Sequence, residues 1–181
     1  RKEKDFFFFA LERQREITSI VVNPDSLKEL QLVKSLGAEP AANIPTPYRD
    51  WRYSIRLDHR FNENHSAFLT YNSQSNKGEN DQSGSQNDLT AGNFTTNELQ
   101  LANLTLNSVL SPRVVNAFTF GYQYWNNLID SEKYVPAVNF PGGTYFGTNV
   151  NVPQQSYQRK WQFRDDLSFT MKSHSLKTGF D

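Results

Sequence analysis

Two adjacent carboxylates, Asp165 and Asp166, are the residues whose types most readily suggest acid–base chemistry. A hydrolase that works with a carboxylate pair needs both groups on the two sides of one scissile bond. The surrounding segment, 157–170, alternates between large apolar and polar residues, as a β-strand does. Because neighbouring side chains of a strand point to opposite faces, the two carboxylates are not predicted to act as a catalytic pair.

The three histidines, His59, His65 and His174, each flank an expected short turn. Such turns lie side by side along a rim, so the imidazoles are expected to cap turns or accept hydrogen bonds instead of sharing a metal. The segment 80–88 offers side-chain oxygens but lacks the spacing and the final Glu of a calcium-binding hand. Neither a G-x-S-x-G nucleophile motif nor a glycine-rich phosphate loop occurs. We therefore predict a protein that is not an enzyme, with no metal and no cofactor.

The composition excludes further classes of protein. Lys+Arg 19 balance Asp+Glu 19, so the basic excess expected of a nucleic-acid binder is absent. Mean hydropathy is −0.70, and no apolar run approaches the roughly 18 residues that a membrane-spanning helix needs. Aromatic residues nevertheless make up 14% of the chain, which is too many for a disordered chain of this polarity. Cysteine is absent, which excludes disulfides and thiolate metal sites.

The elements that must position these residues are strands. A period of two, with large apolar residues on one side and polar ones on the other, predicts about seven strands. They are expected at 5–13, 51–58, 65–72, 98–109, 114–124, 157–170 and 174–180.

The connections between these strands alternate in length. Short polar turns are expected near 62–64, 111–113 and 172–174, and long loops at about 15–50, 73–97 and 128–155. In the first loop Ser26 begins an apparent capping box, and Gly37 could end the helix that follows. The second loop is rich in Asn, Ser, Gly and Gln, which predicts a mobile, solvated segment. The third carries Pro and aromatic residues and is expected to be more ordered.

Long strands with one apolar face, joined alternately by short and long connections, are typical of an outer-membrane β-barrel. The predicted fold class is therefore all-β, an antiparallel transmembrane β-barrel segment with short periplasmic turns and long extracellular loops. Trp51, Trp125 and Trp161 all fall near one rim, as an interfacial aromatic girdle requires. Arg159 and Asp165 oppose this reading, because they occupy the nominally lipid-facing side of their strand. The alternative is a soluble or surface-attached β-sandwich that binds carbohydrate or mediates adhesion.

Four segments also carry sequence motifs that look familiar. KDFFFFALERQ (4–14) is similar to a strand pattern K-D-x-x-F-F-F-x-x-Y-E-x-x-R, with Leu11 in the place of the usual Tyr. YSIRLDHRF (53–61) followed by HSAFLTY (65–71) is similar to a hairpin pattern R-x-D-H followed by R-Y. SPRVVNAFTFGY (111–122) is similar to S-P-x-x-V-N-x-x-x-x-G-Y. DLSF (166–169) with HSLKTGFD (174–181) is similar to D-x-L-S-x-x-x-G-x-H-x-L-K-x-G-x-D, without the Gly before the turn.

In this order the four motifs resemble the barrel of TonB-dependent outer-membrane receptors of the Oar-like group, whose chains also carry a carboxypeptidase-regulatory-like domain. The resemblance implies a cell outer membrane location in a Gram-negative bacterium, membrane lipid around the barrel, and a plug domain and a TonB-type energy-coupling protein as partners. It also implies transport of a scarce solute, such as a glycan, peptide or siderophore. We expect residues 1–181 to be an internal piece of the barrel, cut at both ends, with no plug and no signal peptide.

Two sets of residues are candidates for contact with a solute. Aromatic side chains in the third loop, next to Pro and Gly, could stack on sugars or clamp a peptide: Tyr134, Phe140, Tyr145 and Phe146. Basic side chains on the polar sides of two strands are expected to face the barrel lumen: Arg52, Arg56, Arg60, Lys160 and Arg164. The alternative for these five residues is that they contact no solute and only keep the wall of the lumen hydrated.

Overall fold

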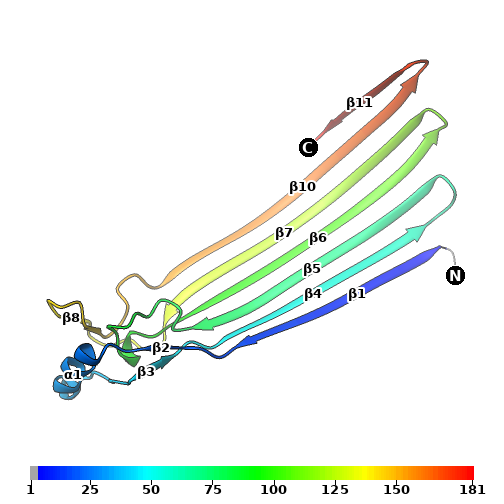
Figure 1. Cartoon of the computed structure of the whole chain (residues 1–181). Coiled ribbons are helices and arrows are strands. Elements are labelled where there is room, and N and C mark those ends of the chain that lie inside the picture. The colour runs from blue at the N-terminus through cyan, green and yellow to red at the C-terminus, as the bar shows by residue number, and fades with distance from the viewer. Residues whose placement is uncertain (1–3) are drawn as a thin grey trace.

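The computed structural model describes residues 4–181; residues 1–3 of the predicted 1–181 domain lie outside the described part. Its main feature is one seven-stranded antiparallel sheet in the order β1-β4-β5-β6-β7-β10-β11 (Figure 1). The strands are β1 (Asp5–Glu16), β4 (Tyr48–Arg60), β5 (His65–Glu79), β6 (Asn93–Ser111), β7 (Val114–Ser131), β10 (Gln154–Met171) and β11 (His174–Phe180). Each pairs with the next along the chain, so the predicted up-and-down arrangement of about seven strands is confirmed.

The register of the ladders separates an apolar from a polar face. Residues directly opposite each other on paired strands share a face. One continuous row across six strands consists of Phe7, Leu57, Leu69, Leu104, Phe120 and Phe163. The next row consists of Phe9, Ile55, Tyr71, Ala102, Tyr122 and Trp161. We call the side that carries these rows the apolar face.

No second large sheet covers either face within residues 4–181, so many of the apolar side chains stay exposed. Phe7 is 83% exposed and Trp161 is 62% exposed. A sandwich would bury such rings between two layers. The β-sandwich alternative is therefore wrong, and the all-β, barrel-type reading is confirmed. No helix in the described part is long and apolar enough to cross a membrane.

Most strands continue farther toward the long loops than the sequence predicted. β5 runs to Glu79 instead of Asn72, β6 starts at Asn93, and β7 runs to Ser131. The β5 extension is polar on both faces, and the β7 extension carries Leu128 on the apolar face but Ile129 on the other, so the alternation that identified the strands is lost there while the ladder hydrogen bonds continue. The predicted long loops shrink accordingly to 17–47, 80–92 and 132–153.

The three long loops pack together into one unit at this end of the sheet, which we call the loop module (Figure 1). It contains β2 (Ser19–Val21), α1 (Pro24–Leu32), the 3-10 turn η1 (Lys34–Leu36), β3 (Asn43–Pro45), η2 (Leu89–Ala91), β8 (Val138–Asn139) and β9 (Tyr145–Phe146). Leu30 and Ala38 from the first loop pack against Phe146 from the third, and all three are buried.

Two expectations about the loops need correction. The helix starts at Pro24 with Asn23 as its N-cap, whose side chain accepts from the Asp25 amide. Ser26 is therefore not a cap but a buried residue whose hydroxyl accepts a hydrogen bond from Thr144 of the third loop. Gly37, with φ 106°, ends η1 in the left-handed conformation that favours glycine, whereas the predicted helix, α1, already ends at Leu32.

The second loop is not simply a solvated segment. Asp88, Thr90 and Ala91 are buried in it. The Asp88 carboxylate accepts from the backbone amide of Glu39 at 2.5 Å and from the Thr90 amide at 2.9 Å. Its polar composition had suggested mobility, but these polar side chains serve as internal acceptors for the backbone of the neighbouring loop.

Candidate functional site

The polar face of the sheet carries the predicted basic residues. Arg56 lies opposite Thr70, and through the same row Asn103, Gly121 and Gln162 share its side. By the same register, the structure places all five predicted residues on this face: Arg52, Arg56, Arg60, Lys160 and Arg164. Their contact with a solute stays a prediction.

Three of these cations are neutralised by carboxylates of the same wall. Arg52 contacts Asp50 at 2.8 Å and Glu12 at 3.3 Å. Arg56 makes two hydrogen bonds to Asp58, at 2.7 and 2.8 Å. Because each pair brings opposite charges together on the exposed wall, it presents little net charge to a ligand.

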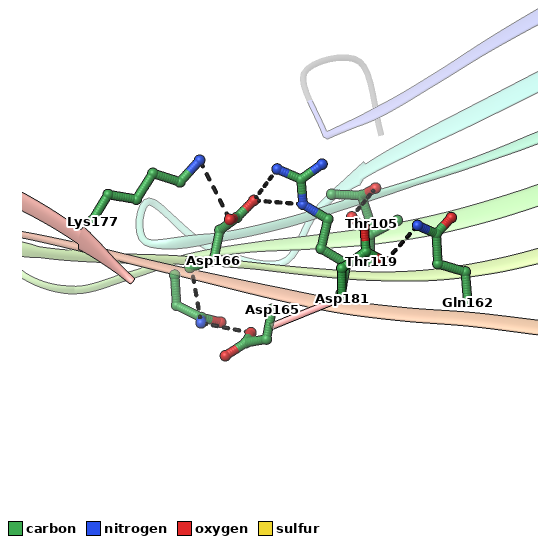
Figure 2. Close-up of polar contacts among 9 residues, drawn as sticks. Thr105, Thr119, Gln162, Asp165, Asp166, Lys177 and Asp181 are labelled. Atoms are coloured by element: carbon green, nitrogen blue, oxygen red, sulfur yellow. Dashed lines mark hydrogen bonds and ion pairs between the residues drawn. The ribbon is translucent and has the colours of Figure 1, made fainter. Parts of the chain in front are cut away.

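Arg164 belongs to the third pair, shown in Figure 2. Its Nε donates to Asp166 Oδ2 at 2.9 Å, and Lys177 approaches the other carboxylate oxygen at 3.4 Å. Asp165 points to the other side of β10, where Asn116 donates to it at 2.7 Å. The two carboxylates therefore lie on opposite faces, as the period of two predicted.

Arg60 and Lys160 differ from the other three. Neither makes an ion pair within the described part of the chain, although both side chains are exposed. They are thus the cations of the predicted set that remain free to meet an anionic group.

A row of amides crosses the polar face near the loop module. Asn127 donates to Asn97 at 2.8 Å, and Asn97 donates to Asn76 at 2.9 Å, so three neighbouring strands are linked by side chains. Gln74, one residue pair farther from the loops, donates to Asp50 at 2.9 Å. This surface offers many neutral donors and acceptors, which suits hydroxyl or amide groups of a ligand.

Trp125 lies within this polar surface, which sequence reasoning missed. It pairs directly with Leu99 on β6 and Gln158 on β10, and both belong to the polar face. The predicted girdle is therefore wrong for Trp125, although Trp51 and Trp161 do lie on the apolar face. The signal was present, since Tyr124 already occupied the apolar side and adjacent strand residues alternate. The half-buried indole lies next to the amide row in the register, two residues before Asn127 on β7.

The four predicted loop rings have different surroundings. Tyr134 is 65% exposed, and its hydroxyl donates to Asp130, which raises the pKa of Tyr134. Phe146 is 1% exposed and forms the core of the loop module, with Phe140 packed against it. Tyr145 is half-buried and donates to the Thr148 carbonyl; burial, and then the charge of Asp88, raise its pKa. Of the four, only Tyr134 presents a largely exposed ring.

Comparison with known proteins gives the architecture a family. The family model of the outer membrane beta barrel domain matches residues 21–181. The chain belongs to this family. No curated protein and no solved structure matches the chain.

In an outer membrane beta barrel, charges on the apolar face need local partners. Arg159 lies over the Tyr124 ring, with 5.7 Å from its Cζ to the ring centroid. Asp165 is half-buried and hydrogen-bonded to Asn116. The two residues that opposed the barrel interpretation thus each have an adjacent group that stabilises their charge.

The histidines of this barrel domain lie near its short turns, as predicted. His59 contacts Asp5 at 2.5 Å across β1 and β4, and His65 Nδ1 lies 3.0 Å from the Ser108 hydroxyl. Within residues 4–181, no three His, Cys, Asp or Glu side chains gather closely enough to hold a metal ion. The family indicates a structural or transport role in the outer membrane.

Proposed function

We propose that the chain forms part of the wall of a TonB-dependent, Oar-like receptor that takes up a scarce solute. The proposal rests on the outer membrane beta barrel family to which the chain belongs and on the four motifs that resemble Oar-like receptors. In it, the apolar face meets the hydrocarbon of the outer membrane and the polar face lines the lumen. A plug domain and an energy-coupling protein act with the barrel.

The single observation that supports solute contact best is the surface around Trp125. The indole is half-buried on this face directly opposite Leu99, and it offers a flat apolar platform with one N–H donor. The amides of Asn97, Asn127 and Gln158 surround it in the register. A few polar groups beside an aromatic ring are the usual make-up of a small-molecule site.

The surroundings of this surface favour a neutral or weakly charged solute. Arg52 lies on the same face and in the same cross-strand row as Trp125, three strands away, and is already paired with Asp50 and Glu12. The nearest free cation is Lys160, two residues from Gln158 on β10. We therefore place glycans and short peptides before strongly anionic ligands. Tyr134 is the loop residue that we propose for the first contact, because its ring is exposed.

The test is uptake by cells that do or do not express the full-length protein. Fluorescent hexasaccharides, hexapeptides and a ferric siderophore are offered, each with and without a protonophore that removes the inner-membrane proton gradient. We expect one of these solutes to accumulate in expressing, energised cells only. Accumulation that persists without the gradient would overturn the energy-coupled proposal, as would no difference between the two strains for any of the probes.

A pair of tryptophan variants then tests the site. Trp125→Ala is expected to weaken binding of the accumulated solute by about tenfold or more, because buried aromatic anchors dominate such contacts. Trp161→Ala, on the opposite face, is the matched control and should bind as the wild type does. Equal binding by both variants would exclude the polar-face site while leaving uptake itself intact.

A further inference from the structure

The strands carry an unusual row of cations on the apolar side of the sheet, just beyond its aromatic residues. Arg15 of β1 lies directly opposite Arg49 of β4, and Arg49 lies directly opposite Lys77 of β5. Arg13 lies opposite Trp51, which places it diagonally next to Arg49. Three like charges in direct cross-strand contact are unfavourable unless something else balances them.

Contacts within residues 4–181 stabilise only some of these positive charges. Lys77 pairs with Glu79 at 3.0 Å and lies over the Phe94 ring. Arg13 lies over the Trp51 ring, 4.8 Å from its centroid. Arg15 and Arg49 make no ion pair within residues 4–181, and both are exposed. Glu98, on the same face, lies opposite Ser75, and no ion pair joins it to either arginine.

Arg49 is the most informative of these residues. It belongs to an inner strand, so both of its direct neighbours are fixed by this chain, and both are cations. No carboxylate from another strand can be inserted between them. The remaining way to neutralise it is an anion that approaches from outside the sheet.

The position of the row limits what this anion can be. Arg49 lies two residues from Trp51 on the loop side, or about 7 Å along the strand. Trp and Tyr side chains mark the boundary between hydrocarbon and head groups. The guanidinium groups therefore lie at head-group depth on the side of the loops, where Arg forms two parallel hydrogen bonds to a phosphate.

We propose that Arg13, Arg15, Arg49 and Lys77 bind the phosphate of a phosphorylated lipid head group in the loop-side leaflet of the outer membrane. This site rests on the proposed placement of the apolar face in lipid. It is independent of the solute site, because the two lie on opposite faces of the sheet. The lipid phosphate supplies the negative charge that no carboxylate of the described residues supplies to Arg15 and Arg49.

The experiment measures lipid binding to the full-length protein in detergent by native mass spectrometry. The probes are bisphosphorylated lipid A and its dephosphorylated form. We expect the phosphorylated lipid to bind more tightly, and Arg15→Gln/Arg49→Gln to bind it about thirtyfold more weakly, because each basic residue near a lipid surface contributes about fivefold. Arg60→Gln/Lys160→Gln removes the same charge from the polar face and should leave binding unchanged.

Several outcomes would overturn the proposal. Equal binding by the double variant and the wild type would exclude the site. Equal loss in the control variant would show a general charge effect, and displacement of the lipid by inorganic phosphate would show a site for a soluble anion. Heat-dependent gel mobility checks that each variant is folded. If the double variant does not fold, Arg49→Lys serves instead; it keeps the charge, loses the paired hydrogen bonds, and should bind about fivefold more weakly.

Failure of the lipid placement itself can be distinguished from failure of this site. If the apolar face does not meet lipid, brominated lipids will not quench Trp161, whatever the arginines do. If Trp161 is quenched but the arginine variants bind lipid A normally, only the phosphate site is wrong.

Discussion

Phenylalanine has opposite surroundings in the two parts of this molecule. On the sheet, Phe7 and its neighbours in the row are exposed on a face that nothing else in the described chain covers. In the loop module, Phe146 is covered by Leu30 and Ala38 from another loop. The same side chain therefore stabilises the loop module by burial within the protein, whereas the sheet can gain from its rings only if the surroundings are themselves apolar.

The polar residues show the reverse difference. The sheet pairs its charges along an exposed wall, as Arg56 does with Asp58. The loop module instead buries Asp88 completely and satisfies it with backbone and hydroxyl donors. The comparison teaches that the loop module is organised like a small water-soluble domain and the sheet like a membrane wall, although both come from one continuous chain.

The largest expected effect tests the core of the loop module. Phe146→Ala should remove about 3–5 kcal/mol from the local stability of this unit, because it leaves a cavity among buried side chains. Limited proteolysis and hydrogen exchange should then show 17–47, 80–92 and 132–153 opening together while the sheet stays protected. Tyr134→Ala, in the same loop but exposed, is the matched control and should change neither readout. If the first and second loops stay protected in the Phe146 variant, the three loops are not one unit.

The next effect compares the two faces of one strand. Leu104 and Asn103 are neighbours on β6, both exposed, and lie on the apolar and the polar face respectively. Leu104→Arg should cost about 2–4 kcal/mol in lipid vesicles, whereas Asn103→Arg should stay within about 0.5 kcal/mol of the wild type. Denaturant unfolding of the full-length protein in vesicles measures both. Equal costs would contradict the difference between the faces.

A smaller effect is expected at alkaline pH in the loop module. Burial raises the pKa of Tyr145 above the ordinary value of 10.0, so the folded module prefers the protonated phenol. This contribution is fully present below pH 10.0 and is lost as the pH rises through the higher pKa of the folded state. Hydrogen exchange of the loops should therefore accelerate above that pH in the wild type and much less in Tyr145→Phe. The same acceleration in both would assign the loss to another group.

The comparison also explains what the sequence could predict. Alternation identified the central part of each strand, such as 51–58, because one face there is apolar and the other is wet. It missed the ends near the loops, such as Ser73–Glu79, where both faces are polar and only backbone hydrogen bonds hold the strand. The prediction for Trp125 was wrong because it considered only how close the residue lies to the rim. It did not consider that Trp125 follows Tyr124 in the strand and therefore points to the opposite face.

The loop module was beyond sequence reasoning for a different reason. Its core joins Leu30 to Phe146, and its central carboxylate joins Asp88 to Glu39. These residues lie far apart in the chain, and no local period connects them. Contacts of this kind depend on where the strands place the loop ends, so a pattern read along the chain gives them no signal.

The central claim, that the apolar face meets hydrocarbon and the polar face meets water, can be measured with the chain's own tryptophans. Two versions of the full-length protein, each with all tryptophans but one replaced by Phe, would keep either Trp161 or Trp125. In vesicles, brominated lipid chains should quench Trp161 strongly and Trp125 little, because only Trp161 lies on the apolar face. Strong lipid quenching of Trp125, or none of Trp161, would contradict the account.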